Sequence, residues 1–115
     1  MIRNIGTEEL KGMMDSGESF VLVNVLESGS YENEHICGSI SMPVQEISQE
    51  APRLLNRDET VIVHCSGPAC AASLSAAEKL ETLGYKDIRR FEGGIEEWKK
   101  AGYCLEGAFY KEAAA

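Results

Sequence analysis

Basic residues are scarce in this chain. Its 115 residues include 11 Lys and Arg against 19 Asp and Glu, a formal net charge of −8. Nucleic acids and anionic membranes are bound through basic faces, so this balance argues against both as partners. No apolar run approaches the roughly 20 residues of a membrane helix. Acidic Glu8 and Glu9 stand where a signal peptide would carry its apolar core. We therefore expect a cytoplasmic protein that binds neither nucleic acid nor membrane.

Metal-binding patterns are also missing. The chain has two histidines and four cysteines, and the cysteine spacing matches no zinc-finger pattern, so we expect no metal site and no cofactor. Because nothing indicates secretion, we interpret each cysteine separately, as a core residue or a reactive thiol, rather than as half of a disulfide. Cys37 in a turn and Cys104 in a terminal strand are interpreted as structural.

The length and the hydrophobic pattern predict one α/β domain. A chain of this size can bury a core without staples. Apolar runs at 20–25 and 60–64 are typical of strands buried on both faces, and 88–91 resembles another strand. Helix signals alternate with them, so we expect a parallel sheet with helices on both faces. The domain is expected to span 1–107, followed by a tail at 108–115 that is either frayed or a non-native addition.

Several local features refine this pattern. Thr7 is expected to cap a helix that Gly17 ends, and the clearest helix covers 71–83, with Leu74 in its apolar stripe and Gly84 as its stop. Residues 28–30 are expected to form a loop. Residues 44–55 are expected to be helical in pieces, with a break or a new turn at Pro52.

The segment that carries chemistry follows the strand at 60–64. There Cys65 lies between a buried strand and the strongest helix, at the edge of the sheet where α/β proteins form their sites. Backbone N–H groups of the turn and the positive helix end favour a thiolate, which is a nucleophile near neutral pH. Gly67 and Pro68 supply the dihedral angles of a curled loop. We interpret Cys65 as a functional thiol; the alternative is a small apolar residue that ends the strand.

Cys70 has two interpretations. In one, it is a small residue that packs at the start of the helix. In the other, it is a resolving thiol that attacks a persulfide or sulfenate on Cys65 and leaves a disulfide. The second requires the two Cα atoms to lie within about 7 Å.

Other chemically versatile side chains are interpreted as structural. His64 precedes Cys65 in a strand and so faces the opposite side, which favours packing over general-base catalysis. His35 is expected to fix a turn through hydrogen bonds, and Trp98 to lie in the core. The three acidic residues near Trp98 are expected to be solvated charges: Glu92, Glu96 and Glu97.

Nearly the whole chain resembles the single-domain rhodaneses, which are thiosulfate sulfurtransferases. The resemblance rests on Glu34-His-Ile-Cys-Gly-Ser-Ile40 before Met42-Pro43, on the strand that ends at Cys65, and on Phe91-Glu-Gly-Gly-Ile-Glu-Glu-Trp98. It implies a five-stranded, mainly parallel sheet and sulfur transfer through a persulfide on Cys65. It also implies a small sulfur donor or a persulfidated protein, and a thiol or cyanide acceptor. We expect a monomer whose loop binds substrate through six residues: Ser66, Gly67, Pro68, Ala69, Cys70 and Ala71.

The sequence departs from the family at the loop. Cys70 stands where many rhodaneses carry an arginine, giving a C-x-G-P-x-C variant, and no Lys or Arg occurs from 60 to 78. Asn24 replaces an aspartate, and Glu34 replaces a glycine. We therefore expect weak use of free thiosulfate, and phosphoryl-transfer chemistry is disfavoured because it needs a guanidinium. Two alternatives to the sulfurtransferase stay open, a non-catalytic binding module and a thiol-redox protein that uses Cys65 and Cys70.

Overall fold

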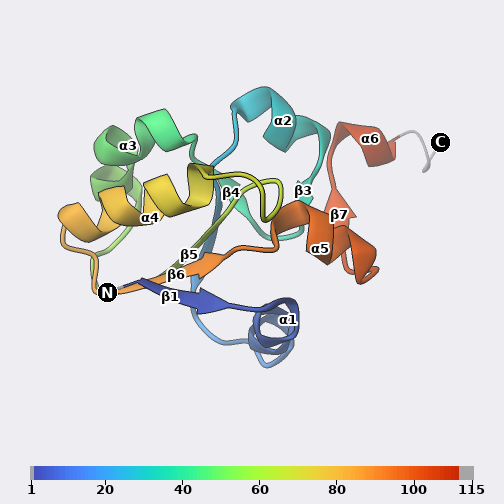
Figure 1. Ribbon diagram of the computed structural model, residues 1–115, viewed down its shortest axis with the longest axis horizontal. Helices are drawn as coiled ribbons and strands as arrows, with labels where there is room; N and C mark the ends of the chain where they lie inside the picture. Colours follow the sequence, from blue (N-terminus) through green and yellow to red (C-terminus); the bar gives the residue numbers. More distant parts are fainter. Residues whose placement is uncertain (1, 112–115) are drawn as a thin grey trace.

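A five-stranded parallel sheet forms the centre of the protein. The computed structural model describes residues 2–111, and its strands lie in the order β1-β6-β5-β2-β4 with every neighbouring pair parallel (Figure 1). The strand bounds are β1 Ile2–Ile5, β2 Val21–Asn24, β4 Ile40–Ser41, β5 Thr60–His64 and β6 Asp87–Phe91. The α/β class and the five-stranded parallel sheet expected from the sequence are confirmed.

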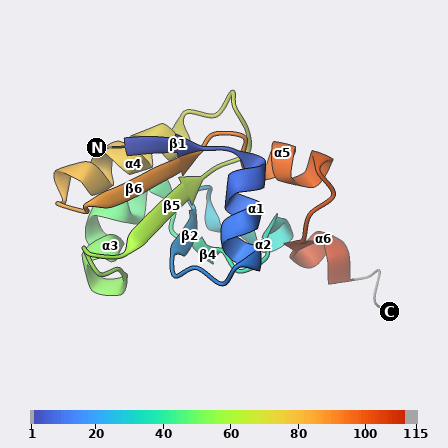
Figure 2. The same cartoon turned by 90° about the horizontal axis from the view of Figure 1, so that it is seen from below.

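Helices cover both faces of this sheet (Figure 2). Helices α1 (Thr7–Asp15) and α5 (Gly94–Lys100) pack on one face. Helices α3 (Ile47–Leu54) and α4 (Ala72–Thr82) pack on the other. The central strand β5 serves both cores, since Ile62 packs toward α1 and α5 while Val61 and Val63 pack toward α3 and α4. Such two-sided burial explains why this strand is apolar throughout.

Smaller elements gather beyond the carboxyl end of the sheet. Helix α2 (Ser28–Asn33) follows β2, and the short helix η1 (Val44–Glu46) precedes α3. Strands β3 (His35–Ile36) and β7 (Leu105–Glu106) form a separate antiparallel pair, and α6 (Ala108–Lys111) follows β7. No helix in the described part of the chain is long and apolar enough to cross a membrane.

The structure corrects several local predictions. Residues 28–30 lie in α2 rather than in a loop. Gly6, not Thr7, is the N-cap of α1, and the Thr7 hydroxyl donates instead to Glu97 at 3.2 Å. Helix α3 continues through Pro52. The backbone bond that proline removes would have ended on the carbonyl of Ser48, an exposed residue where water can replace it.

Helix α4 lies where the sequence places it, but turned relative to the expected stripe. Ala77 and Leu80 of the expected stripe are buried, whereas Leu74 is 40% exposed, and the small residues Ser73 and Ala76 complete the face that packs on the sheet. The glycines predicted to end helices do adopt positive φ, at 72° for Gly17 and 93° for Gly84. Small residues on the inner face let α4 lie close to β5 and β6, which brings its first turn near Cys65.

The expected tail begins with ordered structure. Residues 108–111 form α6, and the hydroxyl of Tyr110 hydrogen-bonds the carboxylate of Glu34 in the segment after α2. Residues 112–115, the rest of the tail, lie outside the described residues. The single-domain boundary at 107 stays a prediction.

Candidate active site at the loop between β5 and α4

Cys65 is the first residue after β5, at the carboxyl end of the sheet. It is 1% exposed and packs against the core beneath α3 and α4. The loop that follows turns back on itself through a hydrogen bond from the N–H of Cys70 to the carbonyl of Gly67, at 3.0 Å. Residues 65–71 therefore form the curled loop expected from the sequence, and they lead into α4 at Ala72.

The start of α5 holds this loop in place. The N–H of Ile95 donates to the carbonyl of Cys65 at 3.1 Å, and the N–H of Glu96 donates to the carbonyl of Ser66 at 2.8 Å. Gly94 has a φ of +61°, and a Cβ there would lie 2.5 Å from the carbonyl oxygen of Cys65. The glycine before Ile95 is thus required by backbone conformation and by close approach to the loop.

Gly67 has a different role from the one expected. It is not among the glycines with positive φ. A Cβ on Gly67 would instead lie 2.6 Å from the Oε2 atom of Glu96, so the missing side chain lets this carboxylate lie against the loop. Glu96 is exposed, as predicted, but its charge stands beside the candidate active loop.

The two loop cysteines are free and in contact with each other. The Cys65 thiol lies 3.4 Å from the carbonyl oxygen of Cys70. Burial raises the pKa of Cys65, and a hydrogen bond with Cys70 raises it further, although Ser73 opposes both. Partial burial acts to raise the pKa of Cys70, but hydrogen bonds from Cys65, Ala72 and Ser66 outweigh it and lower that pKa. That the loop favours a thiolate on Cys65 stays a prediction, since burial and Cys70 act against the thiolate while Ser73 favours it.

Two side chains that the sequence analysis did not select lie behind the loop. Ser73, in the first turn of α4, is fully buried. Its Oγ accepts a hydrogen bond from the Nε of Arg90 on β6, at 2.9 Å. The loop sequence contains no cation, but Arg90 of the neighbouring strand β6 places a guanidinium against the first turn of α4, directly after the loop. Little in the sequence pointed to Arg90, because it follows Arg89 within a stretch that looks like an ordinary strand.

The ends of the neighbouring strands carry buried polar groups. His64 is fully buried and packs toward Phe91 at a ring-centroid distance of 6.4 Å, which confirms that it is packed. Burial lowers its pKa to about 4, so the ring is neutral above that pH, and its Nδ1 lies 3.3 Å from the carbonyl of Cys65. Asn24, which replaces the aspartate expected by resemblance, accepts the N–H of Leu26 at 2.9 Å and so shapes the turn after β2.

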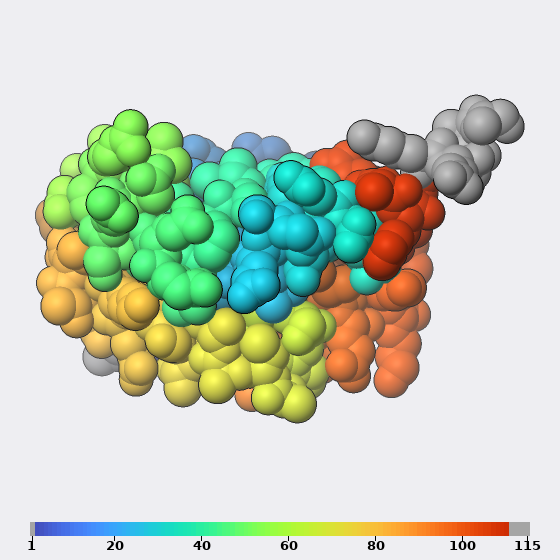
Figure 3. Space-filling model, turned by 90° about the horizontal axis from the view of Figure 1, so that it is seen from above, coloured from blue at the N-terminus to red at the C-terminus, as the bar shows by residue number. Residues whose placement is uncertain are grey.

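A hollow of about 430 Å³ opens beside the loop. Ser66 borders it from the loop, Leu26 from the end of β2, and Lys99 from α5, where its ammonium pairs with Glu34 at 3.0 Å. Phe109 of α6, which is 66% exposed, closes one side. Figure 3 shows the segments that meet here, the start of α2 in blue, the loop in yellow-green and α5 in orange. The hollow is large enough for a small thiol or a peptide side chain.

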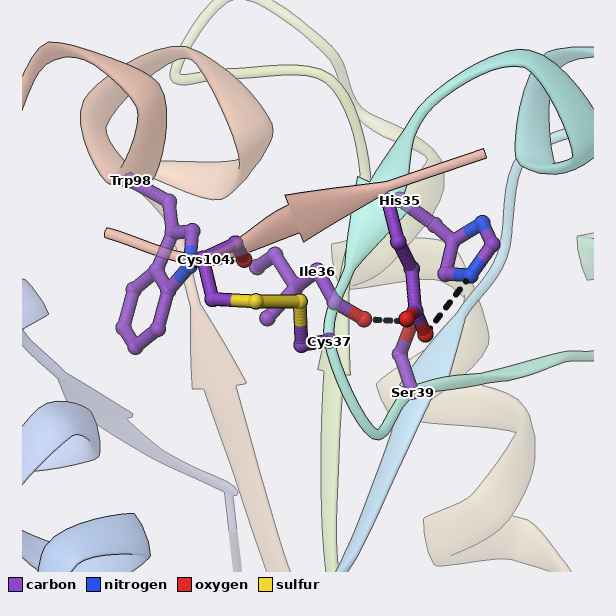
Figure 4. Close-up of a disulfide and its surroundings, with 7 residues drawn as sticks. His35, Ile36, Cys37, Ser39, Trp98 and Cys104 are labelled. Atoms are coloured by element: carbon purple, nitrogen blue, oxygen red, sulfur yellow. Dashed lines mark hydrogen bonds and ion pairs between the residues drawn. A yellow bond between two sulfur atoms is a disulfide. The ribbon is translucent and has the colours of Figure 1, made fainter. Parts of the chain in front are cut away.

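Cys37 and Cys104 form a disulfide, which the sequence analysis did not predict (Figure 4). Their Cα atoms are 5.6 Å apart because β3 and β7 pair antiparallel directly beside them. The carbonyl of Cys104 also accepts hydrogen bonds from the N–H of Cys37 at 3.2 Å and from the Nε1 of Trp98 at 2.9 Å. Trp98 lies in the core, as expected.

His35 fixes the turn before this disulfide, as predicted. Its Nδ1 lies 2.6 Å from the carbonyl oxygen of Tyr31, and its Nε2 lies 3.2 Å from the carboxylate of Glu106. The ring also stacks on Tyr31, with centroids 3.9 Å apart. The histidine and the disulfide together tie the C-terminal strand to the segment after α2.

The geometry of a cysteine on a curled loop between a parallel strand and a helix agrees with a family match. The family model "Rhodanese-like domain" matches residues 6–101. The chain belongs to the rhodanese-like domain family. This rhodanese-like domain superposes on the crystal structure of the BH2092 protein from Bacillus halodurans with a TM-score of 0.87 and 30% identity, covering 93% of this chain and 78% of that one.

Curated relatives of the rhodanese-like domain include sulfur-handling proteins. It is 32% identical over 97 residues to the "Putative sulfur carrier protein YrkF" of Bacillus subtilis (strain 168), covering 84% of this chain and 51% of that protein. It is 30% identical over 79 residues to "Thiosulfate sulfurtransferase GlpE" of Coxiella burnetii, covering 69% of this chain and 71% of that protein. The chain spans about half or less of the first curated relatives it matches.

Proposed function

We propose that this protein is a sulfurtransferase that carries sulfane sulfur on Cys65. The observation that supports this most is the set of donors around the two loop sulfurs. Hydrogen bonding from Ser73 acts to lower the pKa of Cys65, and hydrogen bonding from Ser66 and Ala72 acts to lower the pKa of Cys70. Backbone donors of this kind stabilise an anionic sulfur without a side-chain cation. Relatives named as a sulfur carrier and a thiosulfate sulfurtransferase support the same chemistry.

The reaction is written as two displacements. The Cys65 thiolate attacks the outer sulfur of a donor; the donor's S–S bond breaks, and its remaining part leaves with the bonding electrons, as sulfite when the donor is thiosulfate. Cys65 then carries a persulfide. A thiolate or cyanide next attacks the outer sulfur, takes it as a persulfide or thiocyanate, and releases the Cys65 thiolate. No electrons are gained or lost overall, so no cofactor is needed.

Free thiosulfate should be a poor donor. The loop offers no side-chain cation, Glu96 adds a negative charge beside Gly67, and the whole chain carries −8. A dianion is repelled by this field, most strongly at low salt, where screening is weakest. We therefore infer that the donor is a persulfide on a small thiol or on a protein. Cys70→Arg would restore the cation that many family loops carry and should lower the KM for thiosulfate.

Intact mass after exposure to sulfane donors tests the function. Wild type should gain the mass of one sulfur atom, and Cys65→Ser should gain none that survives removal of the donor. The matched control is Cys70→Ser, which should still load. If wild type takes up no sulfur from any donor, including a protein persulfide, the sulfurtransferase proposal is wrong, and a non-catalytic binding module becomes the better hypothesis.

A second candidate, a thiol-redox protein, is favoured by the contact between the two free cysteines, where the Cys65 thiol donates to the carbonyl of Cys70 at 3.4 Å. Peroxide would oxidise one thiolate to a sulfenate, and the other thiol would displace water to form a disulfide. Mild peroxide should then remove the mass of two hydrogens reversibly. Cys70→Ser should instead accumulate sulfinic acid on Cys65. If oxidised wild type shows overoxidised Cys65 beside a free Cys70, the redox hypothesis is wrong.

The cytoplasmic location expected from the sequence stays a prediction. Disulfides form and persist in oxidising compartments, so the Cys37–Cys104 bond favours an oxidising location or a chain that is protected from cellular reductants. The expected monomer and the absence of nucleic-acid and membrane partners likewise stay predictions.

A further inference from the structure

Arg90 occupies an unusual position for an arginine. It lies on β6 beside Val63 of β5, and its side chain points to the same face of the sheet as Val63 and Cys65, beneath the start of α4. The side chain is 11% exposed. A guanidinium remains charged at any pH that a protein tolerates, so burying it is costly unless nearby groups accept its hydrogen bonds and compensate its charge.

The partners of Arg90 compensate that charge incompletely. Its Nε donates to the neutral hydroxyl of Ser73 at 2.9 Å. Its nearest carboxylate, on Glu92, is 3.7 Å away and 51% exposed, so water screens much of this attraction. A mostly buried guanidinium that donates to a neutral hydroxyl is best explained if that hydroxyl in turn donates a hydrogen bond to an anionic group.

Ser73 connects this cation to the candidate nucleophile. Because its Oγ accepts from Arg90, the hydroxyl proton is free to be donated elsewhere. Ser73 also acts on Cys65, since hydrogen bonding from its hydroxyl and from its backbone favours the thiolate and acts to lower the pKa of Cys65. The three residues form a chain of donors that runs from the guanidinium through the hydroxyl to the sulfur.

We propose that Arg90 is a positioning residue that acts through Ser73 to stabilise the anionic sulfur of Cys65, replacing from beneath the loop the cation that the loop sequence lacks. Where that sulfur is a persulfide, the inference rests on the proposed function. Where it is the thiolate, the inference stands alone. Arg90 itself touches neither donor nor acceptor in this arrangement, because Ser73 lies between it and the sulfur.

The other charges near Cys65 oppose or do not contribute to this effect. Cys70 in the loop acts to raise the pKa of Cys65. Glu96 of α5 lies against Gly67 and repels an anion. His64, on the opposite face of β5, is neutral above about pH 4. Arg90 is thus well placed to decide how much thiolate Cys65 holds near neutral pH.

The test is the pH dependence of alkylation at Cys65. The background is the full chain with Cys70→Ala and the Cys37–Cys104 disulfide kept intact, so that Cys65 is the free thiol. Iodoacetamide reacts with the thiolate, and the rate against pH gives the midpoint of ionisation. Arg90→Gln and Ser73→Ala should each move this midpoint upward and slow alkylation at pH 7 by about 10-fold, the change that one pKa unit brings. Arg90→Lys, which keeps the charge, should recover part of the rate.

Two controls separate this role from a purely structural one. Arg89→Gln removes the neighbouring arginine, which lies on the opposite face and pairs with Asp87 at 3.0 Å, and it should leave the midpoint unchanged. Adding Arg90→Gln to Ser73→Ala should produce no further shift, because the arginine acts through the serine. A midpoint in Arg90→Gln equal to that in Arg89→Gln, or fully additive shifts in the double variant, would overturn the proposal.

The same experiment separates this inference from the proposed function, since alkylation needs no sulfur donor. If the midpoints shift as expected but no donor loads Cys65, the sulfurtransferase proposal fails and the role of Arg90 remains. Should Arg90→Gln fail to fold, Ser73→Ala and Arg90→Lys carry the test by themselves, because an unchanged midpoint in Ser73→Ala also overturns the proposal.

Discussion

Two pairs of cysteines in this protein have opposite chemistry. The loop pair, Cys65 and Cys70, is free, and the thiol of Cys65 donates a hydrogen bond to the carbonyl of Cys70 at 3.4 Å. The seam pair, Cys37 and Cys104, is joined in a disulfide at the antiparallel contact of β3 and β7. Five positions separate the members of the first pair, whereas the members of the second are 67 positions apart.

The surroundings explain the difference. The loop pair is surrounded by N–H and hydroxyl donors, which stabilise a negative sulfur. At the seam, the donors that could stabilise an anion are used on a carbonyl, since Trp98 and Cys37 both donate to Cys104. The seam also supports the loop indirectly, because Trp98 belongs to α5, whose first residues hold the loop carbonyls. We infer that the loop pair reacts and that the disulfide pair stabilises the fold.

The largest expected effect is on stability and belongs to the seam. Replacing both cysteines, Cys37→Ala with Cys104→Ala, should lower the free energy of unfolding by about 4 kcal/mol, since the crosslink closes a long loop in the unfolded chain. Urea unfolding without reductant measures this, and sulfur loading of the folded protein should be unchanged. Cys70→Ala is the matched control and should cost far less. Equal losses in the two variants would remove the distinction between the pairs.

The second effect is a pH dependence of stability at the loop end. The pKa of His64 is lowered from 6.5 to about 4 by burial. Above pH 6.5 the ring is neutral in both states, and between pH 6.5 and 4 the unfolded chain binds a proton that the folded chain excludes. The free energy of unfolding should therefore decrease as the pH is lowered from 6.5 to 4, by about 3 kcal/mol in total.

His64→Phe should remove this part of the acid sensitivity, while His35→Gln, at the seam, should keep it. Urea unfolding at a series of pH values compares the two variants with wild type. A fall in His64→Phe as steep as in wild type would show that carboxylates alone cause it.

The third effect is on reactivity and concerns the contact between α5 and the loop. Gly94→Ala forces a side chain against Cys65 and Gly67 and should slow alkylation of Cys65 about 10-fold or more by displacing the loop. Gly102→Ala is a matched control, since Gly102 also has positive φ, at 80°, but a Cβ there would meet nothing within 4 Å. Both variants share the backbone cost, so equal rates would show that the contact does not shape the loop.

The smallest effect is electrostatic. Glu96→Gln removes the carboxylate beside Gly67 and should lower the KM for thiosulfate about twofold at low salt, with less effect at high salt. Glu106→Gln, beside the seam, makes the same change in net charge and should alter the KM less. A larger effect from Glu106 would mean that overall charge, rather than local charge at the loop, controls donor binding.

The sequence predicted the loop more fully than the seam because the two depend on different ranges of the chain. Strand 60–64, Cys65 and the helix after it are consecutive, and local patterns place them well. The disulfide depends on the pairing of two strands of two residues each, too short to give a pattern. The expectation of a reducing compartment also argued against any disulfide.

The chemistry of the loop needed the structure for a similar reason. Burial and Cys70 act to raise the pKa of Cys65, and Ser73 acts to lower it. Arg90 comes from the next strand, and its role depends on which face of β6 it occupies. Residue type and spacing pointed to Cys65 as the candidate nucleophile but not to the groups that set its pKa.

The most direct test of the account is to locate transferred sulfur by peptide mass after a sulfane donor has been added and removed. Trypsin places the loop pair in residues 58–79, Cys37 in 12–53 and Cys104 in 101–111. After blocking with an alkylating reagent, the account predicts the added sulfur in 58–79, on Cys65, with 12–53 and 101–111 still joined by their disulfide. Sulfur recovered on either seam peptide, with 58–79 unmodified, would contradict it.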